Sequence, residues 1–516
     1  MHSWGLRYGE LVGRWAARRP HRPAVVTDDA TLSYAELAGR IRSLTRVLRA
    51  HGVTPGDRVL CVSENRPEML VLAFACARAG AVFVPVNPAS TPDELRFVLA
   101  DATPAVVCVG SAAESFRSGA VPAPPPVVDL DTLGPGGVGP EGTADDADRP
   151  ADVGPDDAAV ICYTSGTTGH PKGVVLTHAS LHWNSVNTLL GLDIGADDVA
   201  LVTTPLFHVA ALNMLAVNTL YKGATLVLRR RFDPVECLET IAAERVTVTF
   251  AVPTMLAMLE RSPGFDPARL ASLRWVLSGG APLPPETAAR WSARGIPVIA
   301  SYGLSEAGPS VTFRRIDEVG GKPGSSGSPA PLTEVRIVDG DGRPLPDGTA
   351  GEIVVSGRHV AAGYWNAPEA TRAAFRADGL HTGDRGYLDP DGDLVVVGRI
   401  KDTIITGGEN VDPVEVEQAL LAHDAVEEAV VVGLPDDVWG ERIVVVVVPT
   451  SGATVDLDGI RTFLAGRLAG HKHPRRVELW PAVPKSTVGK LLRGAVRDRL
   501  LTEDPPSAPP PQVRVR

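Results

Sequence analysis

The chain carries the stretch Y-T-S-G-T-T-G-H-P-K-G-V at residues 163–174, directly after an apolar run from Ala158 to Cys162. The stretch combines four Ser and Thr hydroxyls, three glycines and one lysine, Lys172. Glycines let a backbone bend so that successive N–H groups point at one anion, and hydroxyls add further donors. Behind a buried strand, this combination indicates a phosphate-binding loop.

The loop is not of the Walker type, which requires G-x-x-x-x-G-K-[ST]. Gly166 and Gly169 are three residues apart, and Lys172 is followed by Gly173. A flexible Gly/Ser/Thr-rich linker is the alternative interpretation, but a linker does not normally follow a strand and end in Pro-Lys-Gly. We therefore interpret the stretch as a different kind of phosphate site.

Strand and helix patterns alternate on both sides of this loop. The runs Val59 to Val62 and Val82 to Val86 are typical of strands, and the mostly apolar stretch from Pro67 to Ala79 predicts a helix between them. Ser33 and Thr91 are expected to be the N-caps of two further helices. The alternation predicts βαβ units, and thus an α/β fold with a largely parallel sheet covered on both faces.

Two later strands end in glycine-rich segments. The strand predicted at Trp275 to Leu277 continues into S-G-G-A-P at residues 278–282, and the strand at Pro297 to Ala300 continues into S-Y-G-L-S-E at residues 301–306. Ligands of open α/β sheets bind at the carboxyl ends of strands, so both segments are candidate walls of a site.

The length of 516 residues predicts at least two domains. We expect a large N-terminal domain at residues 1–400, with parallel αβ-layered sheets and, from Gly320, a small β subdomain. The segment after Arg399 has its own pattern, which predicts a small mobile α+β domain at residues 401–503. The Pro- and Gly-rich connection at residues 119–155 is expected to have little order, and the tail at residues 504–516 to be disordered.

The composition excludes several classes of protein. A net charge of −11 and a pI near 5.6 argue against a nucleic-acid-binding surface. The five cysteines are scattered without a metal-binding spacing, and the first residues do not have the pattern of a secretory signal. The apolar runs are shorter than the ~18 residues that span a bilayer. We therefore expect a cytoplasmic protein without a transmembrane segment.

Four further patterns follow the phosphate loop in order: S-Y-G-L-S-E at residues 301–306, H-T-G-D at 381–384, G-R-I-K-D at 398–402 and P-K-S-T-V-G-K at 484–490. With that loop, the set closely resembles the adenylate-forming superfamily of acyl-CoA synthetases, amino-acid adenylation domains and luciferases. The resemblance implies that a carboxylic acid and ATP form an acyl adenylate and pyrophosphate, and that the acyl group then passes to a thiol. It also implies ATP, Mg²⁺ and coenzyme A as cofactors.

The resemblance assigns roles to individual residues. Thr164 to Lys172 would surround the β- and γ-phosphates, Glu306 would help to hold Mg²⁺, and Asp384 with Arg399 would bind the ribose. The other implied nucleotide contacts are Ser165, Gly166, Thr167, Thr168 and Gly169 in the phosphate loop, Gly279, Gly280, Ala281 and Pro282 on the adenine side, and Tyr302, stacked on the base, with Gly303 and Ser305 beside it.

Lys490 resembles the lysine of the C-terminal domain that bridges the attacking carboxylate and the α-phosphate. Attack of one anion on another is opposed by charge repulsion, so fixed positive charge is the main means of catalysis. A carboxylate is already ionised at neutral pH, so the reaction needs no general base. Thr164, Glu306 and His208 complete the implied catalytic set.

Thioester formation uses a different face of the C-terminal domain in this family. Lys401 would be the hinge residue, and Gly407, Gly408 and Glu409 would approach the pantetheine arm, where glycines allow close backbone contact. The acceptor is CoA or, alternatively, the phosphopantetheine of an acyl or peptidyl carrier protein. The oligomeric state stays open, and a homodimer is one option.

The stretch Phe207-His208-Val209-Ala210 bears on the identity of the acid. Amino-acid adenylation domains usually carry F-D-x-S there, so this chain is not expected to activate an ordinary α-amino acid. The resemblance is closest to bacterial medium- and long-chain fatty-acyl-CoA synthetases, with His208 at the mouth of the acyl pocket. An aryl-acid ligase and a nucleotide-binding protein without turnover stay open as alternatives. Small or apolar residues that suit an apolar acyl tail are Ala211, Leu212, Met214, Leu215, Val217, Ala281, Gly303 and Gly308.

Overall fold

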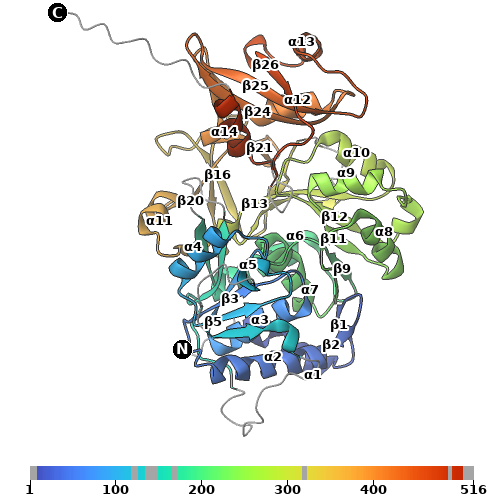
Figure 1. Ribbon diagram of the computed structural model, residues 1–516, viewed down its shortest axis with the longest axis vertical. Coiled ribbons are helices and arrows are strands. Elements are labelled where there is room, and N and C mark those ends of the chain that lie inside the picture. The colour runs from blue at the N-terminus through green and yellow to red at the C-terminus, as the bar shows by residue number, and fades with distance from the viewer. Residues whose placement is uncertain are drawn as a thin grey trace, which may run out of the picture.

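The computed structural model describes residues 8–117, 126–133, 149–164, 171–316, 322, 324–485 and 491–503. Two large sheets lie at one end of the long axis, a small β subdomain lies in the middle, and the C-terminal domain lies at the other end (Figure 1). The predicted α/β class, with a large N-terminal and a smaller C-terminal domain, is confirmed. The exact residue of the domain boundary, and the disorder expected for the tail, stay predictions, and the tail lies outside the described residues.

The first large sheet has the strand order β15-β14-β13-β12-β11-β9-β10-β1-β2 in the part of the chain that the structure describes. The strands from β1 to β13 in this order pair in parallel, and antiparallel pairing adds β2 at one edge and β14 and β15 at the other. The parallel strands therefore end at one common edge. The bounds are β1 (Pro23–Val26), β2 (Thr31–Ser33), β9 (Val199–Val202), β10 (Thr225–Leu228), β11 (Val248–Phe250), β12 (Trp275–Ser278), β13 (Val298–Gly303), β14 (Ser310–Phe313) and β15 (Ser328–Pro329).

The second large sheet, β18-β8-β7-β4-β3-β5-β6, is buried on both faces. Val59 and Cys61 enter one hydrophobic core, whereas the alternate residues Leu60 and Val62 enter another. Burial of both faces explains why these strands are continuous apolar runs in the sequence. The bounds are β3 (Arg58–Val62), β4 (Val82–Val86), β5 (Val106–Val109), β6 (Val127–Asp129), β7 (Ala158–Thr164), β8 (Lys172–Thr177) and β18 (Gly363–Tyr364).

Several helices begin at the expected polar caps. Ser33 forms a capping box with Glu36, and Thr91 forms one with Glu94, so each pair satisfies backbone N–H groups at a helix start. The helix after β3 is buried at every residue from Met69 to Ala79 because it packs inside the core. The bounds are α1 (Leu11–Arg18), α2 (Tyr34–Ala50), α3 (Pro67–Ala79), α4 (Pro92–Ala102), α5 (Glu114–Arg117), α6 (His178–Leu192), α7 (Val217–Tyr221), α8 (Pro234–Ala243), α9 (Pro253–Arg261) and α10 (Pro285–Ala293).

The structure differs from the sequence expectations in three places. The connection at residues 119–155 contains β6, which pairs in parallel with β5, although the sequence predicts little order there. Residues 301–303 do not lie in a loop, because they continue β13 by pairing with β14. A π-helix, Ala210–Ala216, followed by α7, occupies a stretch for which the sequence predicts no element.

The β subdomain and the C-terminal domain each have a core of their own. In the C-terminal sheet, alternate residues of β24 and β25 face α12 and α13 on one side and α14 on the other. The bounds are β16 (Glu334–Val338), β17 (Gly351–Ser356), α11 (Pro368–Ala374), β19 (Phe375–Arg376), β20 (Gly379–Leu388) and β21 (Leu394–Arg399), then β22 (Ile404–Thr406), β23 (Glu409–Val411), α12 (Pro413–Leu421), β24 (Val426–Asp436), β25 (Gly440–Pro449), α13 (Leu457–Leu464), β26 (Arg476–Leu479) and α14 (Arg493–Glu503).

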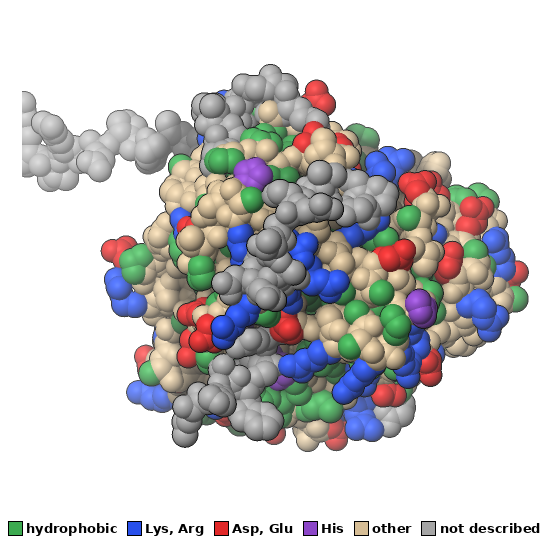
Figure 2. All heavy atoms as spheres, turned by 90° about the horizontal axis from the view of Figure 1, so that it is seen from below, with side chains coloured by type: hydrophobic (Ala, Val, Ile, Leu, Met, Phe, Trp, Pro, Cys, Tyr) green, Lys and Arg blue, Asp and Glu red, His purple; other side chains and the backbone are tan. Residues whose placement is uncertain are grey.

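The surface is mixed in charge. Basic and acidic side chains are both spread over the face shown in Figure 2, which is the end of the molecule opposite the C-terminal domain. None of the helices within the described ranges is both long and apolar enough to cross a membrane.

Candidate active site

The predicted phosphate loop joins two antiparallel strands. β7 ends at Thr164 and β8 begins at Lys172, and these two residues are partners in the register. The hydroxyl of Thr164 lies 3.4 Å from the carbonyl oxygen of Lys172. The structure therefore places the two ends of the loop side by side. The residues between them, Ser165, Gly166, Thr167, Thr168 and Gly169, lie outside the described residues, and their roles stay predictions.

Close packing holds the strands that carry this loop. A Cβ atom added at Gly173 would lie 2.8 Å from Cγ2 of Ile161 and 3.2 Å from Cβ of Trp365, so only glycine fits without a shift. The hydroxyl of Tyr163 donates to Oδ2 of Asp101 over 2.6 Å. Burial and the neighbouring Asp101 carboxylate raise the pKa of Tyr163, which therefore stays a neutral donor. This bond ties the start of the loop to α4.

Glu306 lies in a short 3₁₀ turn, Ser305–Ala307, just beyond β13. The hydroxyl of Tyr364 donates to Oε1 of Glu306 over 2.8 Å. The N–H of Ala361 donates to the backbone carbonyl oxygen of Glu306, also over 2.8 Å. The ring of the same tyrosine has the ammonium of Lys172 5.2 Å from its centroid, within the range of a cation–π contact. The fold thus brings the predicted metal ligand and the predicted phosphate-binding cation to one side chain.

The predicted adenine-side segment turns at the carboxyl end of β12. A Cβ atom added at Gly279 would lie 2.6 Å from Oγ of Ser301, and Gly280 has a φ of +80°, which favours glycine. At Gly303 an added Cβ atom would lie 2.0 Å from the carbonyl oxygen of Pro309. A side chain would therefore meet the backbone at Gly303, would meet the Ser301 side chain at Gly279, and would be strained by the backbone conformation at Gly280. Contacts of a base with this segment, including Ala281 and Pro282, stay predictions.

Asp384 and Arg399 are partners on β20 and β21, and Nε of Arg399 lies 2.9 Å from Oδ1 of Asp384. The hydroxyl of Tyr302 donates to Oδ2 of the same carboxylate over 2.7 Å. Burial and the charge of Asp384 raise the pKa of Tyr302. Each carboxylate oxygen keeps a second lone pair, so Asp384 can still accept hydrogen bonds from the two hydroxyls of a ribose. Stacking of Tyr302 on the base stays a prediction.

His208 lies between β9 and the π-helix Ala210–Ala216, where its carbonyl oxygen accepts from the N–H of Leu212 over 3.0 Å. Burial lowers the pKa of His208 to about 4, so the imidazole is neutral at pH 7. Its ring centroid lies 4.7 Å from that of Phe207. The predicted apolar residues that follow it are buried in the structure, namely Ala211, Leu212, Met214, Leu215 and Val217.

A buried amide lies among these apolar residues. Asn213 is 2% exposed, and neither Oδ1 nor Nδ2 of its side chain has a hydrogen-bond partner among the described residues. Its backbone carbonyl accepts from Nδ2 of Asn184 over 3.1 Å, and Oδ1 of Asn184 accepts from the N–H of Ser310 over 3.1 Å. The π-helix is thereby tied to the strand that follows Glu306. Unpaired buried polar groups are costly, so the Asn213 amide is a candidate ligand contact. The signal in the sequence was a single polar residue within an apolar stretch.

The predicted hinge and thioester residues lie at the start of the C-terminal domain. Lys401 lies in a 3₁₀ turn, Ile400–Asp402, and Glu409 begins β23. Gly407 and Gly408 turn the chain between β22 and β23 with φ values of +60° and +83°. The N–H of Gly407 donates to the carbonyl oxygen of Trp439 over 2.8 Å. Their contacts with a pantetheine arm stay predictions.

Lys490 lies outside the described residues, but the segments that flank it are placed. Lys485 and Leu491, on either side of residues 486–490, form an antiparallel bridge. Farther along, Nη1 of Arg493 lies 3.3 Å from Oδ2 of Asp402, in the turn that holds the predicted hinge. The structure therefore links the segment that carries Lys490 to the hinge turn.

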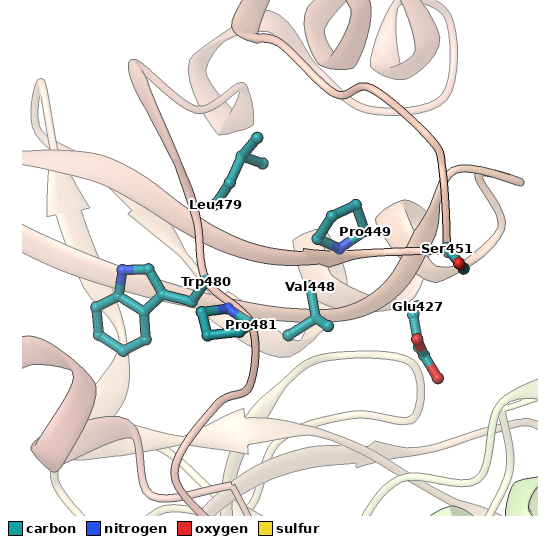
Figure 3. A pocket seen from close by; sticks show the side chains of 7 residues that line it. All are labelled: Glu427, Val448, Pro449, Ser451, Leu479, Trp480 and Pro481. Atoms are coloured by element: carbon teal, nitrogen blue, oxygen red, sulfur yellow. The ribbon is translucent and has the colours of Figure 1, made fainter.

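A hollow of about 400 Å³ lies on the C-terminal domain and contains none of the predicted site residues (Figure 3). At its edge, Glu427 forms an ion pair with Arg261 at the end of α9 in the N-terminal domain. The hollow therefore lies beside a contact between the domains. It is lined by Glu427, Val448, Pro449, Ser451, Leu479, Trp480 and Pro481.

Two family models match the chain. The model described as AMP-binding enzyme matches residues 12–365, and the model described as AMP-binding enzyme C-terminal domain matches residues 415–490. The chain belongs to the AMP-binding enzyme family. Membership of the AMP-binding enzyme family confirms the resemblance to the adenylate-forming superfamily that the five sequence patterns predict.

Curated members of the family resemble the chain over nearly its whole length. A feruloyl-CoA synthase from an Amycolatopsis species is 43% identical, with 95% of this chain and 99% of that protein covered. An indoleacetate–CoA ligase from Aromatoleum aromaticum is 37% identical, with 95% and 98% covered. The long-chain-fatty-acid–CoA ligase FadD13 from Mycobacterium tuberculosis is 35% identical, with 95% and 98% covered.

Solved structures of one AMP-binding enzyme differ in their similarity to this chain. The ATP-bound form of MatB from Rhodopseudomonas palustris has a TM-score of 0.86, and its apo form has a TM-score of 0.77. Both are 35% identical to this chain, with 95% of this chain and 98% of that protein covered. The arrangement of this chain is thus more similar to the ATP-bound form.

Proposed function

We propose that this protein is an ATP-dependent acyl-CoA ligase, which forms an acyl adenylate and pyrophosphate and then transfers the acyl group to CoA. The observation that carries the proposal is the meeting of Lys172 and Glu306 at Tyr364, next to the strand whose Tyr302 contacts Asp384. Lys172 and Glu306 suit phosphates and a metal ion, and Asp384 suits the hydroxyls of a ribose. Three relatives, at 43%, 37% and 35% identity, are named as CoA synthases or CoA ligases, which supports CoA as the acceptor, whereas one at 34% is named as a fatty acid–[acyl-carrier-protein] ligase.

Glu306 suits the role of magnesium ligand. Its Oε1 is held by Tyr364, and the described residues offer no hydrogen bond or ion pair to Oε2. The side chain is partly exposed, so water and phosphate oxygens have access to it. Mg²⁺ is usually bound through one or two carboxylates together with substrate phosphates and water. When bound, magnesium would neutralise charge on the phosphates.

The remaining residues have complementary tasks in this proposal. Lys172 and the phosphate loop bind the β- and γ-phosphates, and Asp384 accepts hydrogen bonds from the ribose. Lys490 brings a positive charge to the α-phosphate, where the ionised carboxylate of the substrate attacks and pyrophosphate leaves. His208, being neutral, neither attracts nor repels the carboxylate at the mouth of the acyl pocket.

For the acid, we favour an aromatic carboxylic acid with a polar ring substituent over a fatty acid. The Asn213 amide, buried and without a hydrogen-bond partner among the described residues, can bond a hydroxyl, a methoxy oxygen or an indole N–H. An alkyl chain would leave this amide unpaired, at a cost of about 1–3 kcal/mol. The two relatives named for aromatic acids, at 43% and 37% identity, support the same choice over the fatty-acid relative at 35%.

An ATP–pyrophosphate exchange assay tests both parts of the proposal. The acids are ferulate, indoleacetate, decanoate and alanine, and CoA is then added to detect the thioester. We expect exchange with ferulate to exceed exchange with decanoate and alanine, followed by thioester formation with CoA. Absence of exchange with every acid would overturn the ligase proposal, and stronger exchange with decanoate would restore the fatty-acid alternative.

The variant Asn213→Leu tests the amide directly, with cinnamate, which lacks ring substituents, as the matched substrate. We expect kcat/KM for ferulate to fall about tenfold, because one hydrogen bond to a buried group is lost, while kcat/KM for cinnamate changes little. Equal losses with ferulate and cinnamate would show that Asn213 maintains the pocket without contacting the substituent.

A further inference from the structure

A short segment joins the two halves of the phosphate and metal site. The N–H of Ala361 donates to the carbonyl oxygen of Glu306 over 2.8 Å, and the N–H of Trp365 donates to the carbonyl oxygen of Gly173 over 2.7 Å. Between them, β18 pairs with β8, the strand that begins at Lys172. Residues 361–365 are therefore bonded to the turn of Glu306 on one side and to the exit of the phosphate loop on the other.

The side chain of Tyr364 lies at the centre of this segment and is itself firmly held. Its backbone N–H donates to Oγ1 of Thr371 over 2.9 Å, and its ring packs edge-on against Phe375 at 5.4 Å between centroids. These contacts fix the position of the ring, and the hydroxyl donates to Oε1 of Glu306 over 2.8 Å.

We propose that Tyr364 is a positioning residue for adenylation, whose hydroxyl holds the Glu306 carboxylate and whose ring holds the Lys172 ammonium. This inference rests on the proposed function, which assigns Glu306 to magnesium and Lys172 to the phosphates. Opposite charges attract strongly where water is scarce, and a direct pair would withdraw both groups from the nucleotide. The described residues contain no ion pair between Lys172 and Glu306, although both contact the same tyrosine. Tyr364 thus keeps each charge directed at its own ligand.

Two substitutions separate the hydroxyl from the ring. Tyr364→Phe removes only the hydrogen bond to Glu306, and we expect the Mg²⁺ concentration for half-maximal ATP binding to rise about tenfold. ATP affinity at saturating Mg²⁺ should change little. Tyr364→Leu also removes the ring beside Lys172, so ATP affinity should fall about fivefold even at saturating Mg²⁺. Calorimetry of ATP binding over a series of Mg²⁺ concentrations measures both effects, without an acid and hence without turnover.

Matched variants give the measurement its controls. The hydroxyl of Tyr34 is also buried and donates over 2.7 Å to the carbonyl oxygen of Ala224, away from the site. Tyr34→Phe should therefore leave the Mg²⁺ dependence unchanged. Glu306→Gln should raise the Mg²⁺ requirement, and adding Tyr364→Phe to it should produce no further rise, because both changes act on one ligand.

The outcomes distinguish the inference from the function on which it rests. If Glu306→Gln shifts the Mg²⁺ dependence but Tyr364→Phe does not, the positioning role is wrong and the proposed function stands. If Tyr364→Phe and Tyr34→Phe lower Tm alike and neither shifts the Mg²⁺ dependence, the hydroxyl bond is only structural. If the unmodified protein does not bind ATP, or Glu306→Gln has no effect on the Mg²⁺ dependence, the proposed function fails and the inference fails with it.

Discussion

The imidazole of His208 is a base that its surroundings keep neutral. Burial lowers its pKa to about 4, compared with about 6.5 in an unfolded chain. At a pH between these two pKa values, the imidazole of His208 binds a proton in the unfolded chain but not in the folded chain. The free energy of unfolding therefore falls as the pH falls from about 6.5 towards 4. An uncharged ring also suits the mouth of an apolar acyl pocket.

The variant His208→Gln cannot take up this proton, so it should lose less stability on acidification than the unmodified protein. Urea unfolding at pH 7.5, 6.0 and 5.0 measures the difference in the free energy of unfolding between the two proteins. His21→Gln, at an exposed position, is the control and should follow the unmodified protein. Parallel curves for His208→Gln and the unmodified protein would contradict a neutral, buried His208.

Single residues differ in how far the sequence reveals them. Glu306 and Lys172 were predictable because their charge and their place in an ordered set of patterns already indicate a chemistry. Tyr364 and Asn213 were not, because their importance depends on contacts that only the fold creates. Tyr364 is important because it contacts Glu306 and Lys172, which are distant in sequence. Asn213 is important because its buried amide has no hydrogen-bond partner among the described residues.

Among the elements, those with local signals were the most predictable. The helix starts at Ser33 and Thr91 follow from capping boxes, in which residues three apart bond to each other. The π-helix Ala210–Ala216 is apolar except for Asn213 and shows no periodicity, so nothing local identifies it. The short strand β6 and the extension of β13 through Gly303 form because β5 and β14 pair with them, which no local pattern reveals.

The hairpin of β7 and β8 depends on a glycine. Gly173→Ala would place a Cβ atom 2.8 Å from Ile161, within the core of the hairpin, and the strands would have to move apart. We expect a loss of about 1–3 kcal/mol in the free energy of unfolding. ATP binding should weaken as well, because Lys172 is the neighbouring residue.

Urea unfolding and ATP calorimetry check this expectation. Gly340→Ala is the matched control, because no atom lies within 4 Å of its added Cβ atom and its φ is not in the left-handed region. This control should change the free energy of unfolding by no more than about 0.5 kcal/mol. Equal effects of the two substitutions would mean that packing at Gly173 is not what holds the hairpin.

At the scale of the whole molecule, two ion pairs among the described residues connect the C-terminal domain to the rest. Nη1 of Arg385, the neighbour of the predicted ribose contact Asp384, lies 2.7 Å from Oδ2 of Asp412, and Arg261 pairs with Glu427 at the hollow of Figure 3. Burial raises the pKa of Asp412, and the charge of Arg385 opposes this shift. The greater similarity to ATP-bound than to apo MatB leads us to expect that these pairs belong to the arrangement for adenylation.

The variant Asp412→Asn removes the charge from one of these pairs while keeping the shape of the side chain. A loss of about 1 kcal/mol in the contact would shift the balance between domain arrangements about fivefold. We expect ATP–pyrophosphate exchange to fall about fivefold, because fewer molecules hold the adenylating arrangement. The rate of thioester formation from a supplied acyl adenylate and CoA should stay equal or rise, because the C-terminal domain can leave the adenylating arrangement more easily.

The ratio of the two half-reactions is the informative quantity, since a general loss of stability would lower both. Glu478→Gln provides the control, because Glu478 pairs with Arg476 on the same strand at 2.6 Å and has no ion pair with the N-terminal domain among the described residues. Its ratio should match that of the unmodified protein. If Asp412→Asn lowers both half-reactions equally, the pair serves stability alone. A fall confined to pyrophosphate exchange would mean that the protein couples the placement of its C-terminal domain to the strand that carries Asp384, the predicted ribose contact.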